Sequence, residues 1–248
     1  MSKVLLVTGS SRGIGAETVR QAAINGYAIC VNYHKNKSAA ETLVESLGQT
    51  SQPVIIEQAD ISQESDVIRL FTTIDRHLGP LTSLVNNAGI LENQRSVVDM
   101  TVDRLTRVFA TNITGSFLCC REAVKRMSTS FGGQGGSIVN LSSRAAVLGA
   151  ANEYVDYAAS KGAIDSLTIG LANEVSTQGI RVNAVRPGLI YTDIHANSGE
   201  PGRVDRLKAG VPMQRGGTVR EVAESILWLL SDASSYTTGS FIDVSGGR

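Results

Sequence analysis

Few cysteines and no clustered metal ligands occur in this sequence. The three cysteines, Cys30, Cys119 and Cys120, form no C-x-x-C pair. Because adjacent residues rarely bridge, we expect small buried thiols in a reducing compartment. No H-E-x-x-H motif or Cys/His cluster is present, so we expect no metal site. The histidines are scattered along the chain, at His34, His77 and His195.

Long hydrophobic runs and an excess of either charge are also absent. The opening MSKVLLVTGSS holds only four consecutive apolar residues, too few for a signal-peptide core, and no later segment approaches the ~18 of a membrane span. Lys and Arg number 23 against 23 Asp and Glu, a net charge of zero. This balance offers no electrostatic surface for nucleic acid or an anionic membrane. We expect a cytoplasmic protein with neither partner.

Short β-rich apolar runs alternate with longer helical patterns along the chain. This alternation favours a Rossmann-like α/β fold, a doubly wound parallel sheet of about seven strands with helices on both faces. No linker or repeat interrupts the series, so we expect one domain over 1–248. The predicted strands are 3–8, 28–33, 53–58, 83–88, 137–142, 180–185 and 241–244. The predicted helices lie near 14–26, 38–47, 63–78, 102–129, 154–177 and 218–231.

One long segment, 189–217, has no regular pattern. Long loops in compact domains are usually lids or binding loops. We therefore expect this segment to be a substrate loop.

A glycine-rich stretch follows the first predicted strand. TGSSRGIG (8–15) has glycines at 9, 13 and 15. A strand-to-helix turn needs glycine where φ is positive or where backbone approaches a ligand, and the helix start offers free N–H groups to a pyrophosphate. Three later strands end in NNAG (86–89), NLSS (140–143) and RPG (186–188). Because the carboxyl ends of parallel strands meet at one edge, these turns predict a single ligand crevice.

Two tyrosines and a lysine lie close together in YVDYAASKGA (154–163). In a helix, Tyr157 and Lys161 form an i, i+4 pair, and Tyr154 lies on nearly the same stripe. A free tyrosine has a pKa of roughly 10, and a nearby ammonium favours the phenolate, so either phenol could act as an acid or base nearer neutrality. The alternative is a tyrosine packed on the core beside a solvated lysine.

TGSSRGIG, NNAG, Asn112 in ATNITGS, Ser143, YAASK (157–161) and RPG occur in this order along nearly the whole chain. This motif set resembles that of the short-chain dehydrogenase/reductases, and among them 3-oxoacyl-carrier-protein reductases and glucose 1-dehydrogenase-like members. The resemblance implies an enzyme that moves a hydride between a nicotinamide cofactor and a small-molecule carbonyl or secondary alcohol. A catalytically idle dinucleotide-binding sensor or scaffold is the alternative.

The resemblance also implies roles for individual residues. Tyr157, the tyrosine four residues before Lys161, is the proton donor or acceptor. Lys161 lowers the pKa of Tyr157 and holds the nicotinamide ribose. Ser143, preferred over Ser142, hydrogen-bonds the substrate oxygen where charge develops. Asn112 positions a water that relays protons to Lys161, unless it is only a mid-helix asparagine bonded to backbone.

The end of the second predicted strand favours NADP(H) over NAD(H). NAD-selective family members carry an acidic residue there, whereas NYHKNK (32–37) has none, and Arg12 adds a cation from the glycine turn. Exposed basic residues on a solvated loop would be the alternative. Asp60 resembles the family's adenine contact. The expected cofactor contacts are Tyr157 and Lys161 together with Gly9, Ser11, Arg12, Gly13, Ile14, Gly15, Asn32, Tyr33, His34, Lys35, Asp60, Ile61, Asn87, Ala88, Gly89, Pro187, Gly188, Ile190 and Thr192.

A homotetramer is a further implication of the resemblance. It would form through the predicted helices 102–129 and 154–177 of each copy. Packing inside one subunit explains their apolar faces equally well. The apolar residues on these helices include Val108, Phe117, Leu167 and Leu171.

Overall fold

Seven parallel strands pair into one sheet in the computed structural model, which describes residues 3–194 and 198–248. Their spatial order is β3-β2-β1-β4-β5-β6-β7, so the direction of winding reverses between β1 and β4. In open α/β sheets, ligands bind at this reversal, outside the carboxyl ends of the strands. The strands are β1 (Lys3–Val7), β2 (Tyr27–Tyr33), β3 (Val54–Gln58), β4 (Ser83–Asn86), β5 (Gly136–Leu141), β6 (Ile180–Pro187) and β7 (Phe241–Val244).

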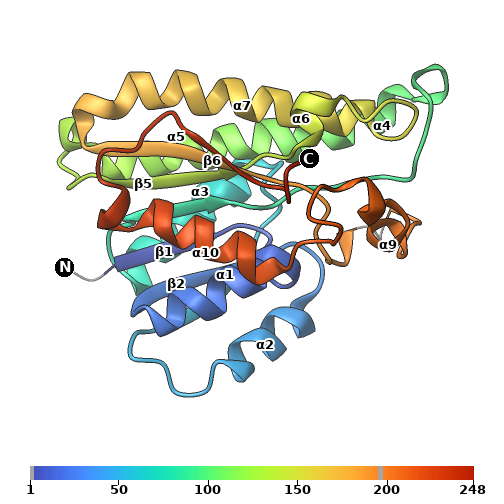
Figure 1. The fold of residues 1–248 in the computed structure, drawn as a ribbon. Coiled ribbons are helices and arrows are strands. Elements are labelled where there is room, and N and C mark those ends of the chain that lie inside the picture. Colours follow the sequence, from blue (N-terminus) through green and yellow to red (C-terminus); the bar gives the residue numbers. More distant parts are fainter. Residues whose placement is uncertain (1–2, 195–197) are drawn as a thin grey trace.

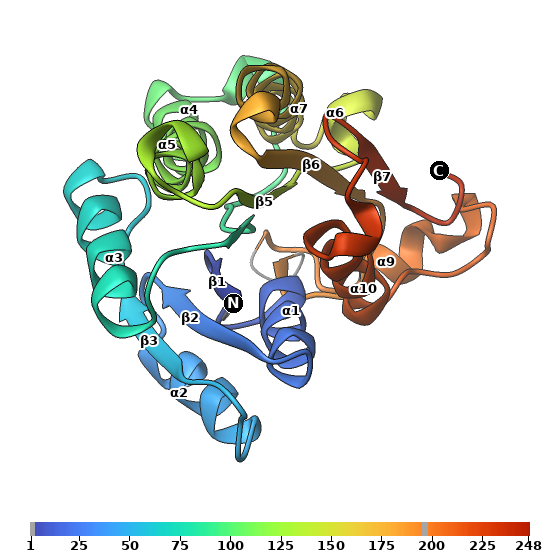
Figure 2. The same cartoon turned by 90° about the vertical axis from the view of Figure 1, so that its left-hand side faces the viewer.

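Helices cover both faces of this sheet (Figures 1 and 2), which confirms the predicted doubly wound α/β fold. Helices α3, α5 and α7 pack on one face, and α1, α2 and α10 pack on the other. None of the helices within 3–194 and 198–248 is long and apolar enough to cross a membrane. The helices are α1 (Gly13–Ile24), α2 (Lys37–Ser46), α3 (Glu64–His77), α4 (Val102–Phe109), α5 (Gly115–Met127), α6 (Ala145–Leu148), α7 (Val155–Val175), α9 (Arg203–Leu207) and α10 (Val219–Leu230).

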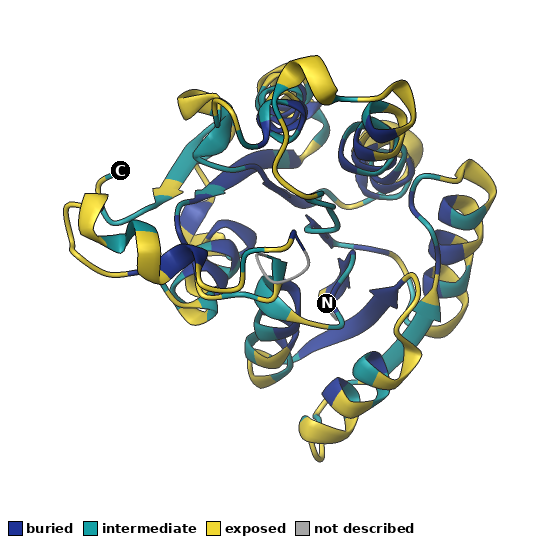
Figure 3. Ribbon diagram, turned by 90° about the vertical axis from the view of Figure 1, so that its right-hand side faces the viewer, coloured by how far each residue is buried: buried dark blue, intermediate teal, exposed yellow. Residues whose placement is uncertain are grey.

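Two hydrophobic clusters, one on each face, hold the layers together. All seven residues of β2 are buried, as expected for a strand covered on both faces. Figure 3 shows buried residues along the central strands and exposed residues on the outer sides of the helices. Burial of this kind fixes the strand ends, and with them the turns that follow each strand.

The helix predicted over 102–129 is divided in the structure. A π-helical turn, η2 (Ala110–Thr114), separates α4 from α5. The cause is tertiary, because the side chain of Asn112 within this turn is bonded to a neighbouring loop and to α7. Such turns inside helices often mark functional sites.

Candidate active site

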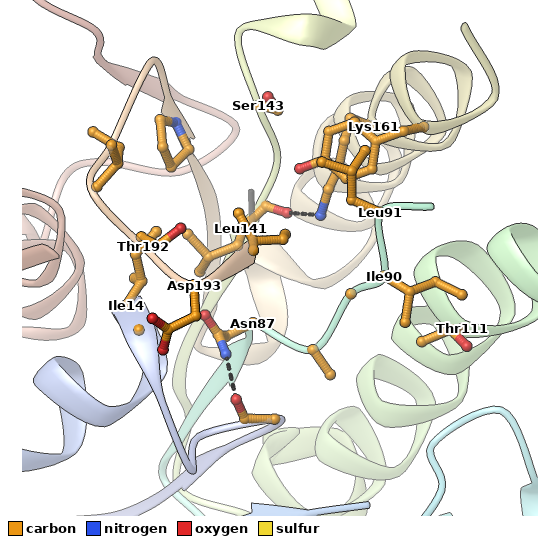
Figure 4. Close-up of a pocket in the computed structure, with 18 of the residues that line it drawn as sticks. Ile14, Asn87, Ile90, Leu91, Thr111, Leu141, Ser143, Lys161, Thr192 and Asp193 are labelled. Carbon is orange, nitrogen blue, oxygen red and sulfur yellow. Dashed lines mark hydrogen bonds between the residues drawn. The ribbon is translucent and has the colours of Figure 1, made fainter. Parts of the chain in front are cut away.

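A cavity of about 610 Å³ opens at the carboxyl ends of the strands, within the size range of small-molecule and cofactor sites. Figure 4 shows part of its lining, with Ser143 and Lys161 on one side and Ile14, Asn87 and Thr192 on another. Most of the predicted cofactor contacts line it. They are Gly9, Ser11, Arg12, Gly13, Ile14, Asn32, Tyr33, His34, Lys35, Asp60, Ile61, Asn87, Ala88, Gly89, Tyr157, Lys161, Pro187, Gly188, Ile190 and Thr192.

The glycine turn brings backbone against the end of β4. Gly9 has a φ of +59°, and a Cβ there would lie 2.9 Å from the Cα of Ala88. The side chain of Asn87 donates hydrogen bonds of 2.8 and 3.0 Å to the carbonyls of Thr8 and Gly9. Gly15 does not line the cavity within the described residues; a Cβ there would strike the Asn87 side chain. Its absent side chain therefore serves helix packing against this turn.

Asn32, at the end of β2, supports the same turn from below. Its buried amide accepts a 3.0 Å hydrogen bond from the N–H of Gly9 and donates to the carbonyl of Ala59 at 3.2 Å. The Asn32 side chain therefore makes these hydrogen bonds within the protein. It would contribute to ligand binding through the shape that it gives the glycine turn.

Basic side chains line the cavity where β2 ends. Arg12 and Lys35 are both exposed, and neither pairs with a carboxylate in the part of the chain that the structure describes. His34 lies 3.5 Å from Asp60, which also accepts hydrogen bonds from Ser62. Two cations without a carboxylate partner among the described residues therefore line this part of the cavity.

Tyr157 and Lys161 lie one turn apart on α7 and share one wall of the cavity. The Nζ of Lys161 is 5.5 Å from the centroid of the Tyr157 ring and donates a 2.6 Å hydrogen bond to the carbonyl of Leu141. Burial raises the pKa of Tyr157 to about 12, and a hydrogen bond with the Ser143 side chain lowers it. Burial also lowers the pKa of Lys161 to about 8, while the charge of Asp165 raises it.

These pKa shifts differ from the expectation that Lys161 lowers the pKa of Tyr157. Burial is the largest influence on both groups, because each charged form loses hydration inside the cavity wall. In this state of the protein the phenol holds its proton. A protonated phenol is suited to act as an acid.

Asn112 lies beside Lys161 but does not line the cavity in the described segments. Its Oδ1 accepts a 2.8 Å hydrogen bond from the N–H of Ile90, and its Nδ2 donates to the Ile90 carbonyl at 3.0 Å and to Ser160 at 3.1 Å. A Cβ on Gly89 would lie 3.4 Å from the Asn112 Oδ1 and 3.6 Å from the Lys161 Nζ. Only the second lone pair of Oδ1 is left for a water.

The start of α7 places the two tyrosines differently. Tyr154 is at the N-cap, outside the helix, and its hydroxyl lies 3.4 Å from the hydroxyl of Ser198. A buried ion pair fixes the helix beside it, because Arg104 of α4 donates to Asp156 through Nε at 2.7 Å and Nη2 at 3.2 Å. Both tyrosines line the cavity, Tyr157 from the first turn of α7 and Tyr154 from the residue just before the helix.

Several cavity residues were not predicted from the sequence. Arg203 of α9 is buried, lies over the Tyr154 ring at 5.0 Å and pairs with Glu153 and Glu200. These contacts tie the predicted substrate loop to the segment before α7. Ile90 and Leu91 directly follow NNAG, so the rule that ligands bind beyond strand ends could have identified them. Ser142 and Tyr154, the alternatives to Ser143 and Tyr157, also line the cavity, as do Leu189, Asp193 and Ile194 of the predicted substrate loop. The remaining unpredicted lining residues are Asn36, Ala59, Thr111, Leu141, Arg144, Ala145, Leu148, Ala150, Glu153 and Arg248.

The chemistry of this cavity fits a dinucleotide better than a metal ion. The hydroxyl of Thr192, on its wall, is buried without a hydrogen-bond partner, so a bound group could satisfy it. Within 3–194 and 198–248, no three His, Cys, Asp or Glu residues gather as metal ligands. His195 and the part of the predicted substrate loop at 195–197 lie outside the described residues.

Comparisons with known proteins agree with this geometry. A family model described as enoyl-(acyl carrier protein) reductase matches residues 9–248. An uncharacterized oxidoreductase of Escherichia coli is 58% identical, with 99% of each chain covered. A 3-oxoacyl-[acyl-carrier-protein] reductase of Staphylococcus epidermidis is 33% identical, covering 100% of this chain and 99% of its own. A short-chain dehydrogenase/reductase mutant of Serratia marcescens has a solved structure with a TM-score of 0.90, 29% identity and coverage of 99% and 97%. The chain therefore belongs to the short-chain dehydrogenase/reductase family of oxidoreductases.

Proposed function

We propose that this protein interconverts a carbonyl compound and a secondary alcohol with NADP(H), using Tyr157 as the general acid and base. The observation that carries this proposal is the placement of Ser143, Tyr157 and Lys161 along one cavity that also contains the glycine turn. Members of the family use a nicotinamide dinucleotide. When bound, the nicotinamide supplies or accepts the hydride.

The glycine turn and the strand ends would hold this cofactor. The turn at Gly9 and Gly13 leads into α1, whose first N–H groups are suited to a pyrophosphate. Thr192 would give its unpaired hydroxyl to a polar group of the nicotinamide end. Asp60 and Ile61 lie at the other end of the cavity wall and would border the adenine.

In the direction of reduction, Tyr157 would donate its phenolic proton to the substrate oxygen. Ser143 would hydrogen-bond the same oxygen, because a fixed donor stabilises the charge that develops there. In the direction of oxidation, Tyr157 would take the hydroxyl proton. This pairing is supported by the position of Ser143 and Tyr157, which line the same cavity.

Lys161 would stabilise the phenolate that remains on Tyr157 after proton transfer. A positive charge beside a phenolate favours the charged form, and the ammonium is already anchored on the Leu141 carbonyl. It would also bind the nicotinamide ribose. Asn112 would keep the Gly89–Ile90 backbone beside Lys161, and a water on its remaining lone pair would serve the proposed relay.

We infer a preference for NADP(H) from the charges at the end of β2. Arg12 and Lys35 have no carboxylate partner in the described residues. A 2′-phosphate would be an anionic partner for both side chains. A charge-assisted hydrogen bond of this kind contributes about 1.5 to 3 kcal/mol. An acidic residue, which would repel the phosphate, is absent from 32–37.

We also propose the setting in which this chemistry takes place. The chain would act as one cytoplasmic domain over 1–248, with 189–217 as its substrate loop. It would assemble as a homotetramer through α5 and α7, where Phe117 and Ile169 are about half exposed. Two of the residues expected at that contact, Val108 and Leu167, are buried within the chain and belong to its own core.

A reduction screen tests the proposed function. The purified protein is mixed with NADPH and a panel of ketones, sugars and acyl thioesters, and the loss of NADPH absorbance is followed against a blank without substrate. We expect turnover with at least one carbonyl class. NADPH binding by calorimetry without turnover on any member of the panel would favour the idle dinucleotide-binding protein instead.

A further inference from the structure

A chain of charged side chains lies behind Lys161, away from the cavity. Asp165 comes one helical turn after Lys161 on α7. Arg186, at the end of β6, donates to the Oδ2 of Asp165 through Nε at 3.1 Å and Nη2 at 2.9 Å. Arg186 also lies 3.9 Å from Asp243 of β7, which pairs with Arg144. Neither Asp165 nor Arg186 lines the cavity in the described segments, so direct binding does not explain this pair.

The ion pair between Asp165 and Arg186 leaves one oxygen of the carboxylate without a hydrogen bond. Both contacts from Arg186 go to Oδ2, while Oδ1 is buried without a hydrogen-bond partner. The two side chains are 14% and 18% exposed, so water screens their charges only partly. The negative charge of this carboxylate therefore also raises the pKa of other cations close to it.

Lys161 is such a cation, because side chains four residues apart lie on the same helix face, with about 5–6 Å between their Cβ atoms. Asp165 is the charged side chain that raises the pKa of Lys161 against the effect of burial. The other groups around the ammonium, among the described residues, carry no formal charge at neutral pH. They are the Leu141 carbonyl of β5, the Tyr157 phenol of α7 and, beside the same glycine, the Asn112 amide of η2.

We propose that Asp165 and Arg186 are positioning residues that act through Lys161. The carboxylate holds a proton on the ammonium, and Arg186 limits that effect by binding one of its two oxygens. Together they set how tightly the neighbouring Tyr157 and Lys161 hold their protons. The arginine of the RPG turn would thus serve the catalytic pair rather than the cofactor. This inference rests on the roles proposed above for Tyr157 and Lys161.

Nuclear magnetic resonance of the full chain, labelled with ¹³C at the lysine ε-carbons, measures the relevant protonation directly. The Lys161 signal is assigned with Lys161→Met. Asp165→Asn removes a negative charge and should lower the Lys161 pKa by about one unit, whereas Arg186→Gln removes the opposing charge and should raise it. The double variant should return close to the wild-type value.

Two controls separate this electrostatic effect from a structural one. Arg186→Lys keeps the positive charge and should leave the Lys161 pKa nearly unchanged. Asp75→Asn removes a carboxylate from an Asp–Arg pair with Arg126, outside the cavity lining, and should also leave it unchanged. If Asp165→Asn fails to fold, the two Arg186 variants still decide the question.

Unchanged pKa values in both charge-removing variants, or shifts in the same direction, would overturn the proposal. The titration needs no substrate, so it stands even if the reduction screen finds no turnover. Where turnover is found, the inflection in the pH profile of alcohol oxidation should move as the Lys161 pKa does. Loss of activity without a moved inflection would indicate a structural role alone.

Discussion

Ser142 and Ser143 are adjacent in the chain, but their hydroxyl groups have different partners. Ser142 is 3% exposed and donates a 3.2 Å hydrogen bond to the backbone carbonyl of Lys161. Ser143 is half-buried on the cavity wall, where its Oγ accepts a 3.1 Å hydrogen bond from the N–H of Ala145 and its side chain lowers the pKa of Tyr157. The first hydroxyl therefore supports the backbone of α7, whereas the second is the one that we propose as the donor to the substrate oxygen.

Alanine at each serine separates these two functions. Ser143→Ala should lower kcat for carbonyl reduction by about 10²–10³, the usual effect of removing one donor to a developing negative charge. Ser142→Ala should keep kcat within about tenfold and instead lower the free energy of unfolding by about 1 kcal/mol, the contribution of one hydrogen bond. Steady-state kinetics and urea unfolding of both variants provide the comparison. If instead Ser142→Ala lowered kcat and Ser143→Ala lowered only the free energy of unfolding, the proposed roles of the two serines would be exchanged.

Lys161 should destabilise the folded protein at neutral pH. Burial lowers its pKa from 10.5 to about 8, so the unfolded chain holds the proton more tightly than the folded one. The native state is then disfavoured below about pH 8, and this effect fades as the pH rises towards 10.5. The shift corresponds to about 3–4 kcal/mol.

Lys161→Met should therefore abolish turnover and yet gain stability relative to the wild type at pH 7. That gain should shrink by about 3 kcal/mol between pH 7 and pH 10.5. Guanidinium unfolding of both proteins across this range measures the difference, and the loss of the hydrogen bond to Leu141 adds only a constant offset. If the difference in free energy of unfolding between the two proteins did not change with pH, burial would not lower the pKa of Lys161 as described.

The ratio of kcat/KM with NADPH to that with NADH tests whether Arg12 and Lys35 bind the 2′-phosphate. The wild type should favour NADPH over NADH by at least about tenfold in kcat/KM, because one charge-assisted contact to the 2′-phosphate contributes about that much. Arg12→Ala should weaken NADPH and leave NADH nearly unchanged. Lys35→Asp should go further, since it places an acid where the ribose hydroxyls would bind.

Lys37→Ala is the matched control for these variants. Lys37 is exposed two residues from Lys35, pairs with Glu41 and does not line the cavity. Lys37→Ala should leave the preference for NADPH unchanged. Added salt should weaken that preference by screening the attraction of Arg12 and Lys35 to the 2′-phosphate. If Arg12→Ala lowered kcat/KM equally with NADPH and with NADH, the charge of Arg12 would not contribute to cofactor preference.

Assembly should depend on the layer that contains α5 and α7. Phe117→Glu and Ile169→Glu add a charge at half-exposed apolar positions and should reduce the mass measured by light scattering, because a buried charge disfavours association. Ile24→Glu changes an exposed residue of α1, on the other face of the sheet, and should leave the mass unchanged. A wild-type mass of 26.2 kDa at micromolar concentration would reject assembly.

The sheet could be predicted from the sequence because its signals are local. Continuous apolar runs such as VLLV indicate strands buried on both faces. Glycine after β1 indicates a positive φ, which the structure confirms at Gly9, and its close approach is to Ala88 of the protein itself. The division of the helix at Asn112 gave no local signal. It depends on hydrogen bonds to Ile90 and Ser160, which lie 22 and 48 residues away.

The choice between the two tyrosines shows the same limit. Helical spacing places Tyr154 and Tyr157 on nearly one stripe, so periodicity alone left both possible. The structure begins α7 at Val155, which removes Tyr154 from that stripe. Arg203, over the Tyr154 ring, was missed because it reaches Glu153 across 50 residues of sequence, and ion pairs between loops have no periodic pattern.

Turnover by Tyr157→Phe, with Tyr154→Phe as its partner variant, tests the central claim most directly. The substrate found in the reduction screen is used with NADPH at saturating concentration, and cofactor binding is checked by calorimetry in each variant. Tyr157→Phe should bind NADPH and lose at least about 10²–10⁴ in kcat, the contribution of general acid catalysis, while Tyr154→Phe stays within about tenfold. Near-wild-type turnover by Tyr157→Phe would contradict the account.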